Sequence, residues 1–178
     1  MIKLIFCLLF LSFIWGCEGS RFAEQFVSKH IEEGYDKFKN TTLYKTRPRI
    51  EIISDFGSDV SFWASYVCSE ERNCTPSKVL LNFYHSSQFG YRYTYTSELI
   101  YIVDGKRMNL GILDSYDFTR HPSLPKIRVE QMSKYISFDD FKLLAYGKIV
   151  EGRLGSDEFK FSYEDREVLR MMVKNVQK

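Results

Sequence analysis

The feature that most constrains this fold is a two-residue period of apolar side chains, which holds over most of the chain from Arg49 onward. That period is typical of β-strands with one buried face. Asp104-Gly105 separates two of the apolar runs, and Asp-Gly favours the tight type I′ turn of a hairpin between antiparallel strands. The predicted strands cover residues 49–54, 61–67, 78–84, 91–96, 99–103, 106–110, 126–136, 149–154 and 158–161. The loop 121–125 is expected between two of them, because its two prolines lack a backbone donor.

Three helices are expected beside these strands. Apolar residues near a 3.6-residue period predict an amphipathic helix over residues 20–39. Ser137 with Asp140, and Ser162 with Asp165, resemble capping boxes at the start of an internal and a C-terminal helix. Gly147 is suited to a left-handed cap where the internal helix ends. The fold class is therefore α+β, with a largely antiparallel sheet that forms a sandwich if its halves pack face to face.

The N-terminus has the composition of an export signal. Lys3 precedes an apolar run over residues 4–15, and Gly16 and Cys17 then lead into polar residues. A basic start, a short apolar core and a small-residue exit describe a secretory signal, and the run is short for a bilayer span. The chain therefore divides into a signal peptide (1–16), a lipid-anchored tether with the N-terminal helix (17–48) and one α+β domain (49–178).

Ile14-Trp15-Gly16-Cys17 resembles the lipobox of bacterial lipoproteins, although Trp15 stands where a small residue is usual. The resemblance implies that Cys17 is acylated and that the signal is removed before it. Glu18 is not the Asp associated with inner-membrane retention, so the outer membrane is favoured. Two alternatives remain, namely cleavage after Gly19, which gives a secreted protein without Cys17, and retention of the segment as an uncleaved anchor.

A second resemblance lies near the C-terminus. The segments Ser137–Phe141, Lys148–Gly155 and Glu158–Phe159 look like the ending of many uncharacterised bacterial secreted proteins and lipoproteins. It covers about 40 of the 178 residues. It implies an origin in the bacterial envelope, and it implies no activity and no catalytic residue.

Of the four cysteines, Cys7 leaves with the signal and Cys17 is the lipid site, so Cys68 and Cys74 remain. An exported chain meets an oxidising compartment, and an isolated pair there favours a disulfide. The alternative is two free thiols. The strands on either side of this short loop are expected to pair.

No catalytic residue, metal ligand or cofactor site is predicted. The three histidines, His30, His85 and His121, lack the spacing of a metal site and are interpreted as surface residues. No Gly-x-Ser-x-Gly motif marks a nucleophile. The net charge of +2 comes from intermixed charges, which argues against a nucleic-acid surface.

Tyr91, Tyr93 and Tyr95 alternate in one predicted strand, and this is the segment with a possible recognition surface. Tyrosine suits contacts with sugars and proteins, but cross-strand packing explains the pattern as well. The expected function is that of a non-enzymatic envelope lipoprotein that binds the membrane through its lipid and an unknown protein or glycan through its domain. The alternatives are a secreted hydrolase without a recognisable motif and a structural component of the envelope.

Overall fold

The computed structural model describes residues 30–47, 50–53, 59–69, 74–121 and 124–176. The elements in chain order are β1 (Ile31–Asp36), β2 (Thr41–Thr46), β3 (Ile50–Ile53), β4 (Asp59–Ser69), β5 (Lys78–Ser87), β6 (Glu98–Val103), β7 (Lys106–Ile112), β8 (Ser115–His121), β9 (Leu124–Ser137), α2 (Phe138–Tyr146), β10 (Val150–Leu154), β11 (Asp157–Lys160) and α3 (Tyr163–Val176). The α+β class with a largely antiparallel sheet is thereby confirmed.

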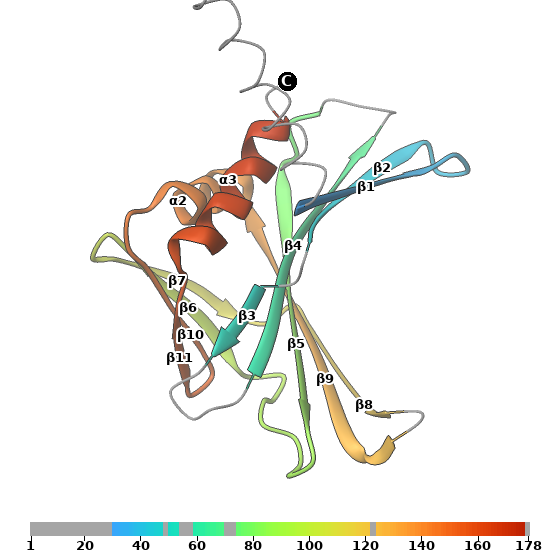
Figure 1. The fold of residues 1–178 in the computed structure, drawn as a ribbon, viewed down its shortest axis with the longest axis vertical. Coiled ribbons are helices and arrows are strands. Elements are labelled where there is room, and N and C mark those ends of the chain that lie inside the picture. The colour runs from blue at the N-terminus through green and yellow to red at the C-terminus, as the bar shows by residue number, and fades with distance from the viewer. Residues whose placement is uncertain (1–29, 48–49, 54–58, 70–73, 122–123, 177–178) are drawn as a thin grey trace, which may run out of the picture.

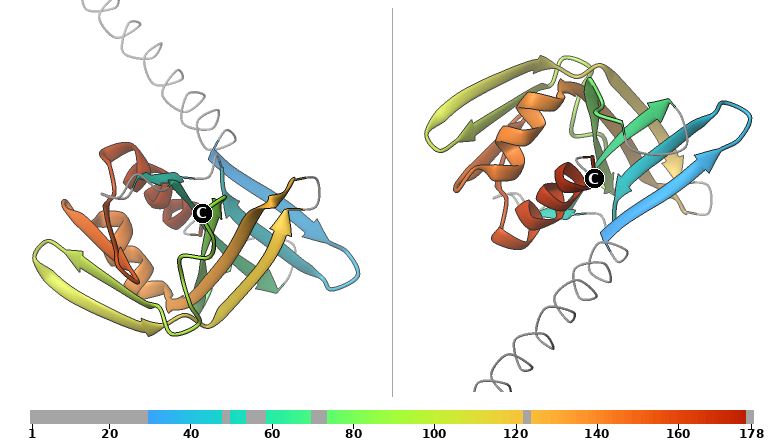
Figure 2. Two further views of the ribbon diagram at one scale, coloured as in Figure 1. Left: turned by 90° about the horizontal axis from the view of Figure 1, so that it is seen from below. Right: turned by 90° about the horizontal axis from the view of Figure 1, so that it is seen from above.

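The strands form two antiparallel sheets. The large sheet has the order β1-β2-β4-β5-β9-β8, with β3 also paired to β4, and the small sheet has the order β11-β10-β6-β7. The two sheets curve around α2 and α3, which lie together at one end of the space between them (Figures 1 and 2). Strands β5, β9 and β8 extend beyond the helices toward the opposite end of the molecule (Figure 1). None of the helices in the described ranges is long and apolar enough to cross a membrane.

The core is built from the inward faces of both sheets and from one face of each helix. Phe62 on β4 is fully buried, and its ring contacts Phe83 of β5 and Phe161 after β11. The helix residues that complete the core recur every three to four positions, as the amphipathic pattern requires; they are Phe138, Phe141, Leu144 and Ala145 of α2, and Leu169, Met172, Val173 and Val176 of α3.

Several local predictions are confirmed. Asp104 and Gly105 have φ of 51° and 80°, as a type I′ hairpin turn between β6 and β7 requires. The Ser137 hydroxyl accepts the Asp140 N–H at 3.0 Å, and the Ser162 hydroxyl accepts the Asp165 N–H at 3.1 Å. Each helix therefore begins where its capping residues predict.

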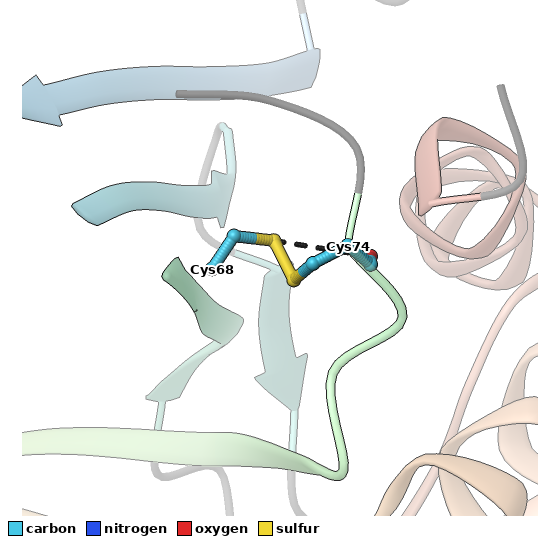
Figure 3. Close-up of a disulfide and its surroundings, with 2 residues drawn as sticks. All are labelled: Cys68 and Cys74. Carbon is cyan, nitrogen blue, oxygen red and sulfur yellow. Dashed lines mark hydrogen bonds between the residues drawn. A yellow bond between two sulfur atoms is a disulfide. The ribbon is translucent and has the colours of Figure 1, made fainter. Parts of the chain in front are cut away.

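The disulfide between Cys68 and Cys74 is present, with its Cα atoms 5.6 Å apart. It joins the end of β4 to the segment that leads into β5 (Figure 3). The two strands pair antiparallel, from Val60 opposite His85 to Ser65 opposite Leu80. The predicted pairing of the strands that flank the cysteines is thus confirmed.

The N-terminal helix over residues 20–39 is not observed in the described residues. Residues 31–36 form β1, which pairs with β2 in a hairpin whose turn is held by the Asp36 carboxylate, an acceptor for the Phe38 and Lys39 N–H groups. Residues 20–29 lie outside the described residues, as do Cys17 and the signal. Both strands lie before residue 49, where the domain was expected to begin. The helical period was misleading because β1 is an edge strand in which Ile31 is the one buried residue, so its side chains do not show a clear two-residue alternation.

Two further expectations are wrong in detail. Gly147 has φ −55° and ψ 141°, so it is not a left-handed cap. Arg170 and Arg166 of α3 donate to the carbonyl oxygens of Ala145 and Gly147 instead, and this satisfies the end of α2. Strand β9 begins at Leu124, so the predicted loop 121–125 is shorter than expected.

Candidate functional site

A buried carboxylate on β9 organises the region where the two sheets meet. Glu130 is 0% exposed, and its oxygens accept hydrogen bonds from His85 Nδ1 at 2.8 Å and from the backbone N–H groups of Arg92 at 2.9 Å and Tyr93 at 2.8 Å. Tyr116 Oη lies 2.9 Å from Glu130 Oε1 and 2.8 Å from the Tyr93 carbonyl oxygen, so its proton can go to either. Side chains from β5, β8 and β9 therefore converge with the β5–β6 loop on one carboxylate.

These donors fix the charge of Glu130. Burial raises the pKa of its carboxyl, but hydrogen bonds from His85, from the Arg92 and Tyr93 backbone and from Tyr116 outweigh burial and hold the pKa below its ordinary value. The carboxylate is therefore ionised at neutral pH. Because an ionised carboxylate can only accept, His85 must carry its proton on Nδ1.

A second buried carboxylate ties the same loop to the small sheet. Asp157 on β11 is 1% exposed. It accepts a hydrogen bond from Tyr93 Oη at 2.5 Å and forms an ion pair with the Arg92 guanidinium. Burial raises the pKa of the Tyr93 hydroxyl, and its hydrogen bond to Asp157 raises it further. Tyr93 is thus a neutral donor that bridges the two sheets.

Hydrogen bonds to the Glu130 and Ser97 side chains explain why residues 91–96 do not form the predicted strand. Their backbone donors are used by side chains: Arg92 and Tyr93 donate to Glu130, and the Thr94 N–H donates to Ser97 Oγ at 3.0 Å. Every buried N–H needs an acceptor, and here a carboxylate replaces a neighbouring strand. The alternating tyrosines therefore lie on an irregular loop.

The three tyrosines do not share one face. Tyr93 is 3% exposed and belongs to the buried network, whereas Tyr91 is 44% exposed and Tyr95 is 74% exposed. Tyr91 packs edge-on against Phe118 of β8, with ring centroids 4.9 Å apart. Of the three tyrosines predicted to form a recognition surface, Tyr91 therefore packs with an aromatic side chain of β8, whereas Tyr93 is buried.

We call this group the aromatic surface, and it consists of Tyr91, Tyr116, Phe118 and Arg128. Phe118 is 54% exposed, and its ring centroid lies 5.8 Å from that of Tyr116. Arg128 is on β9, next to β8, and its guanidinium lies 5.9 Å from the centroid of the Tyr91 ring. Phe118 is opposite Glu130 in the β8–β9 register, so the exposed rings lie beside the buried carboxylate.

The sequence reasoning missed the buried pair of His85 and Glu130, and it also missed Asp157 and the residues that join Tyr91 in the aromatic surface. His85 is 3% exposed, so its interpretation as a surface residue is wrong. The alternation of side chains along β9 was the available signal for Glu130. Glu130 is on the same face of the strand as Met132 and Ile136, which are both in the core. A charged residue on the buried face of a strand indicates a partner in the interior.

The polar groups of this network are already hydrogen-bonded to one another. Glu130 already accepts from several donors and is held ionised, so it is a poor proton acceptor. Among the described residues no serine, threonine or cysteine is hydrogen-bonded to His85 as a nucleophile would be. Nor do three His, Cys, Asp or Glu side chains gather as metal ligands in the part of the chain that the structure describes.

Comparisons with family models, with curated proteins and with solved structures found no match for this chain.

Proposed function

We propose that this protein is a non-enzymatic exported lipoprotein that binds a glycan at the aromatic surface and is anchored to a membrane through Cys17. The observation that carries the proposal is that Tyr91 and Phe118 remain about half exposed although a buried network fixes the loop beneath them. Exposed rings on a rigid support lose little conformational entropy on binding.

The chemistry of these side chains suits a sugar. A pyranose ring presents a face of C–H groups that packs on an aromatic ring, while its hydroxyl groups need polar partners at the edge of the contact. Phe118 supplies the apolar face, and Tyr91 and Arg128 supply a hydroxyl and a guanidinium beside it. A protein partner would need a larger apolar area than these few rings provide.

Replacing Phe118 with alanine is expected to weaken glycan binding at least tenfold, because it removes the most exposed ring of the aromatic surface. A glycan array probed with the purified domain would identify an oligosaccharide, and isothermal titration would then compare the variants. Tyr135→Ala is the matched control, since Tyr135 is also 54% exposed but does not belong to the aromatic surface. Absence of binding across the array, or equal losses in both variants, would contradict the proposal.

The anchor is tested separately. In cells fed a clickable fatty-acid analogue, the wild-type protein is expected to be labelled and to partition with membranes, because acyl chains give about 0.8 kcal/mol per buried methylene. Cys17→Ser is expected to abolish both the label and the partitioning, whereas Cys7→Ser should abolish neither. A Cys17→Ser protein that labels as strongly as the wild type would refute lipidation and leave the secreted alternative.

The disulfide supports export without depending on the lipid. Disulfides persist in oxidising compartments, and Cys68 with Cys74 forms one in this fold. Both the secreted and the lipid-anchored forms would meet such a compartment.

A further inference from the structure

A cleft of roughly 600 Å³ lies on the face of the small sheet that is turned away from the core. Leu99, Tyr101 and Val103 of β6 point into the core, so the alternate residues Ile100 and Ile102 point outward. Both isoleucines line the cleft. Ile102 is 39% exposed, and Ile100, which is 5% exposed, lies deeper in the floor of the cleft.

Charged residues flank this apolar floor on both sides. Ile102 is opposite Arg107 of β7, and Ile100 is opposite Arg153 of β10. The two arginines are therefore two strands apart, about 10 Å across the sheet, and offset by about 7 Å along it. An extended arginine side chain spans more than half of that separation, so both guanidinium groups can reach one group that lies above the isoleucines.

The other charges of the cleft leave these arginines available. Lys160 pairs with Glu151 at 3.5 Å. Glu158 is opposite Arg153 in the β10–β11 register, but within the described ranges neither Arg153 nor Arg107 has a carboxylate oxygen within 4.0 Å of its guanidinium. The cleft thus combines an apolar floor, the Lys160–Glu151 ion pair and two arginines that have no ion-pair partner among the described residues.

We propose that this cleft binds a small amphiphilic carboxylate, whose hydrocarbon part lies on Ile100 and Ile102 and whose carboxylate is held between Arg107 and Arg153. Arginine presents a planar fork of donors that matches a carboxylate, and an apolar floor stabilises a chain that leaves water. The volume lies in the usual range of about 300–1,000 Å³ for small-molecule sites. This site is separate from the aromatic surface, and the proposal does not rest on glycan binding.

Isothermal titration with decanoate, below the concentration at which it forms micelles, tests the site. Decanoate is expected to bind at least tenfold more tightly than acetate, which lacks the chain, and than decyltrimethylammonium, which has the opposite charge. Arg107→Gln and Arg153→Gln are each expected to weaken decanoate binding about tenfold. Arg47→Gln is the matched control, because Arg47 is an exposed arginine after β2 whose ion pair is with Glu32.

Both cleft arginines are exposed, so their glutamine variants should fold, and circular dichroism would confirm this. Equal binding of decanoate and decyltrimethylammonium would overturn the proposal, as would cleft variants that bind like Arg47→Gln. A loss of glycan binding in Phe118→Ala with unchanged decanoate binding would show that the two sites are independent.

Discussion

Glu130→Ala is expected to lower the free energy of unfolding by about 4 kcal/mol, because it removes the common acceptor of a buried network. The His85 imidazole and the backbone N–H groups of Arg92 and Tyr93 would each lose a buried partner. Urea denaturation at pH 7, followed by circular dichroism, measures the change. The loop that carries Tyr91 should become more susceptible to proteolysis, since its backbone donors are no longer held.

Glu151→Ala provides the control for this prediction. Glu151 is on β10, is about half exposed and pairs with Lys160, so its loss should cost less than about 1 kcal/mol. If the two variants proved equally stable, Glu130 would not organise the loop as its geometry indicates.

The stabilisation by Glu130 should also depend on pH. The folded-state pKa of Glu130 is lower than the ordinary glutamate value of 4.5, so the folded protein binds its proton less readily than the unfolded chain. This stabilisation is complete above about pH 4.5 and is lost as the pH falls through the lower, folded-state pKa. The stability difference between the wild type and Glu130→Gln should therefore be largest near pH 7 and shrink below pH 4.5. A difference that grows on acidification would contradict this assignment.

The elements that the sequence predicted correctly are those whose cause is local. Asp104-Gly105 needs only its own backbone conformation to form a turn, and Ser137 needs only the N–H of Asp140, three residues later. Likewise, the pairing of β4 with β5 follows from the short loop between Cys68 and Cys74. In each case the residues that cause the turn, cap or strand pair lie within a few residues of it, so a short stretch of the sequence is enough to predict it.

The features that the sequence could not predict are set by distant residues. Residues 91–96 have a strand pattern, but Glu130, nearly 40 residues later, accepts the hydrogen bonds that a neighbouring strand would have accepted. Strand β8 was not predicted either, and it is stabilised by pairing along β9. The aromatic surface combines Tyr91 of the loop with Phe118 of β8. It could therefore not be predicted without knowing that residues 91–96 form a loop and that residues 115–121 form a strand. Tertiary contacts of this kind override local propensity.

Gly152→Ala is expected to lower the free energy of unfolding by about 3 kcal/mol, because the small sheet has no room for a side chain at that position. A Cβ atom on Gly152 would overlap the ring of Phe159, the residue opposite it on β11. That ring cannot move aside easily, since it packs against Tyr101 and Phe161. Urea denaturation measures the effect, and Gly34→Ala is the control, because a Cβ on Gly34 of β1 would meet nothing within 4 Å.

A compensating substitution distinguishes this overlap from a general effect of alanine in a strand. Phe159→Leu removes the ring atoms that a Cβ on Gly152 would meet, so it should cost stability in the wild type and restore part of it in Gly152→Ala. A double-mutant cycle is expected to give a favourable coupling of about 2 kcal/mol. Additive losses would show that Gly152 is required for its backbone conformation instead.

The same double-mutant cycle can be measured by decanoate titration. Because Arg153 follows Gly152 on β10 and lines the cleft, this titration tests whether the cleft depends on the close contact between β10 and β11.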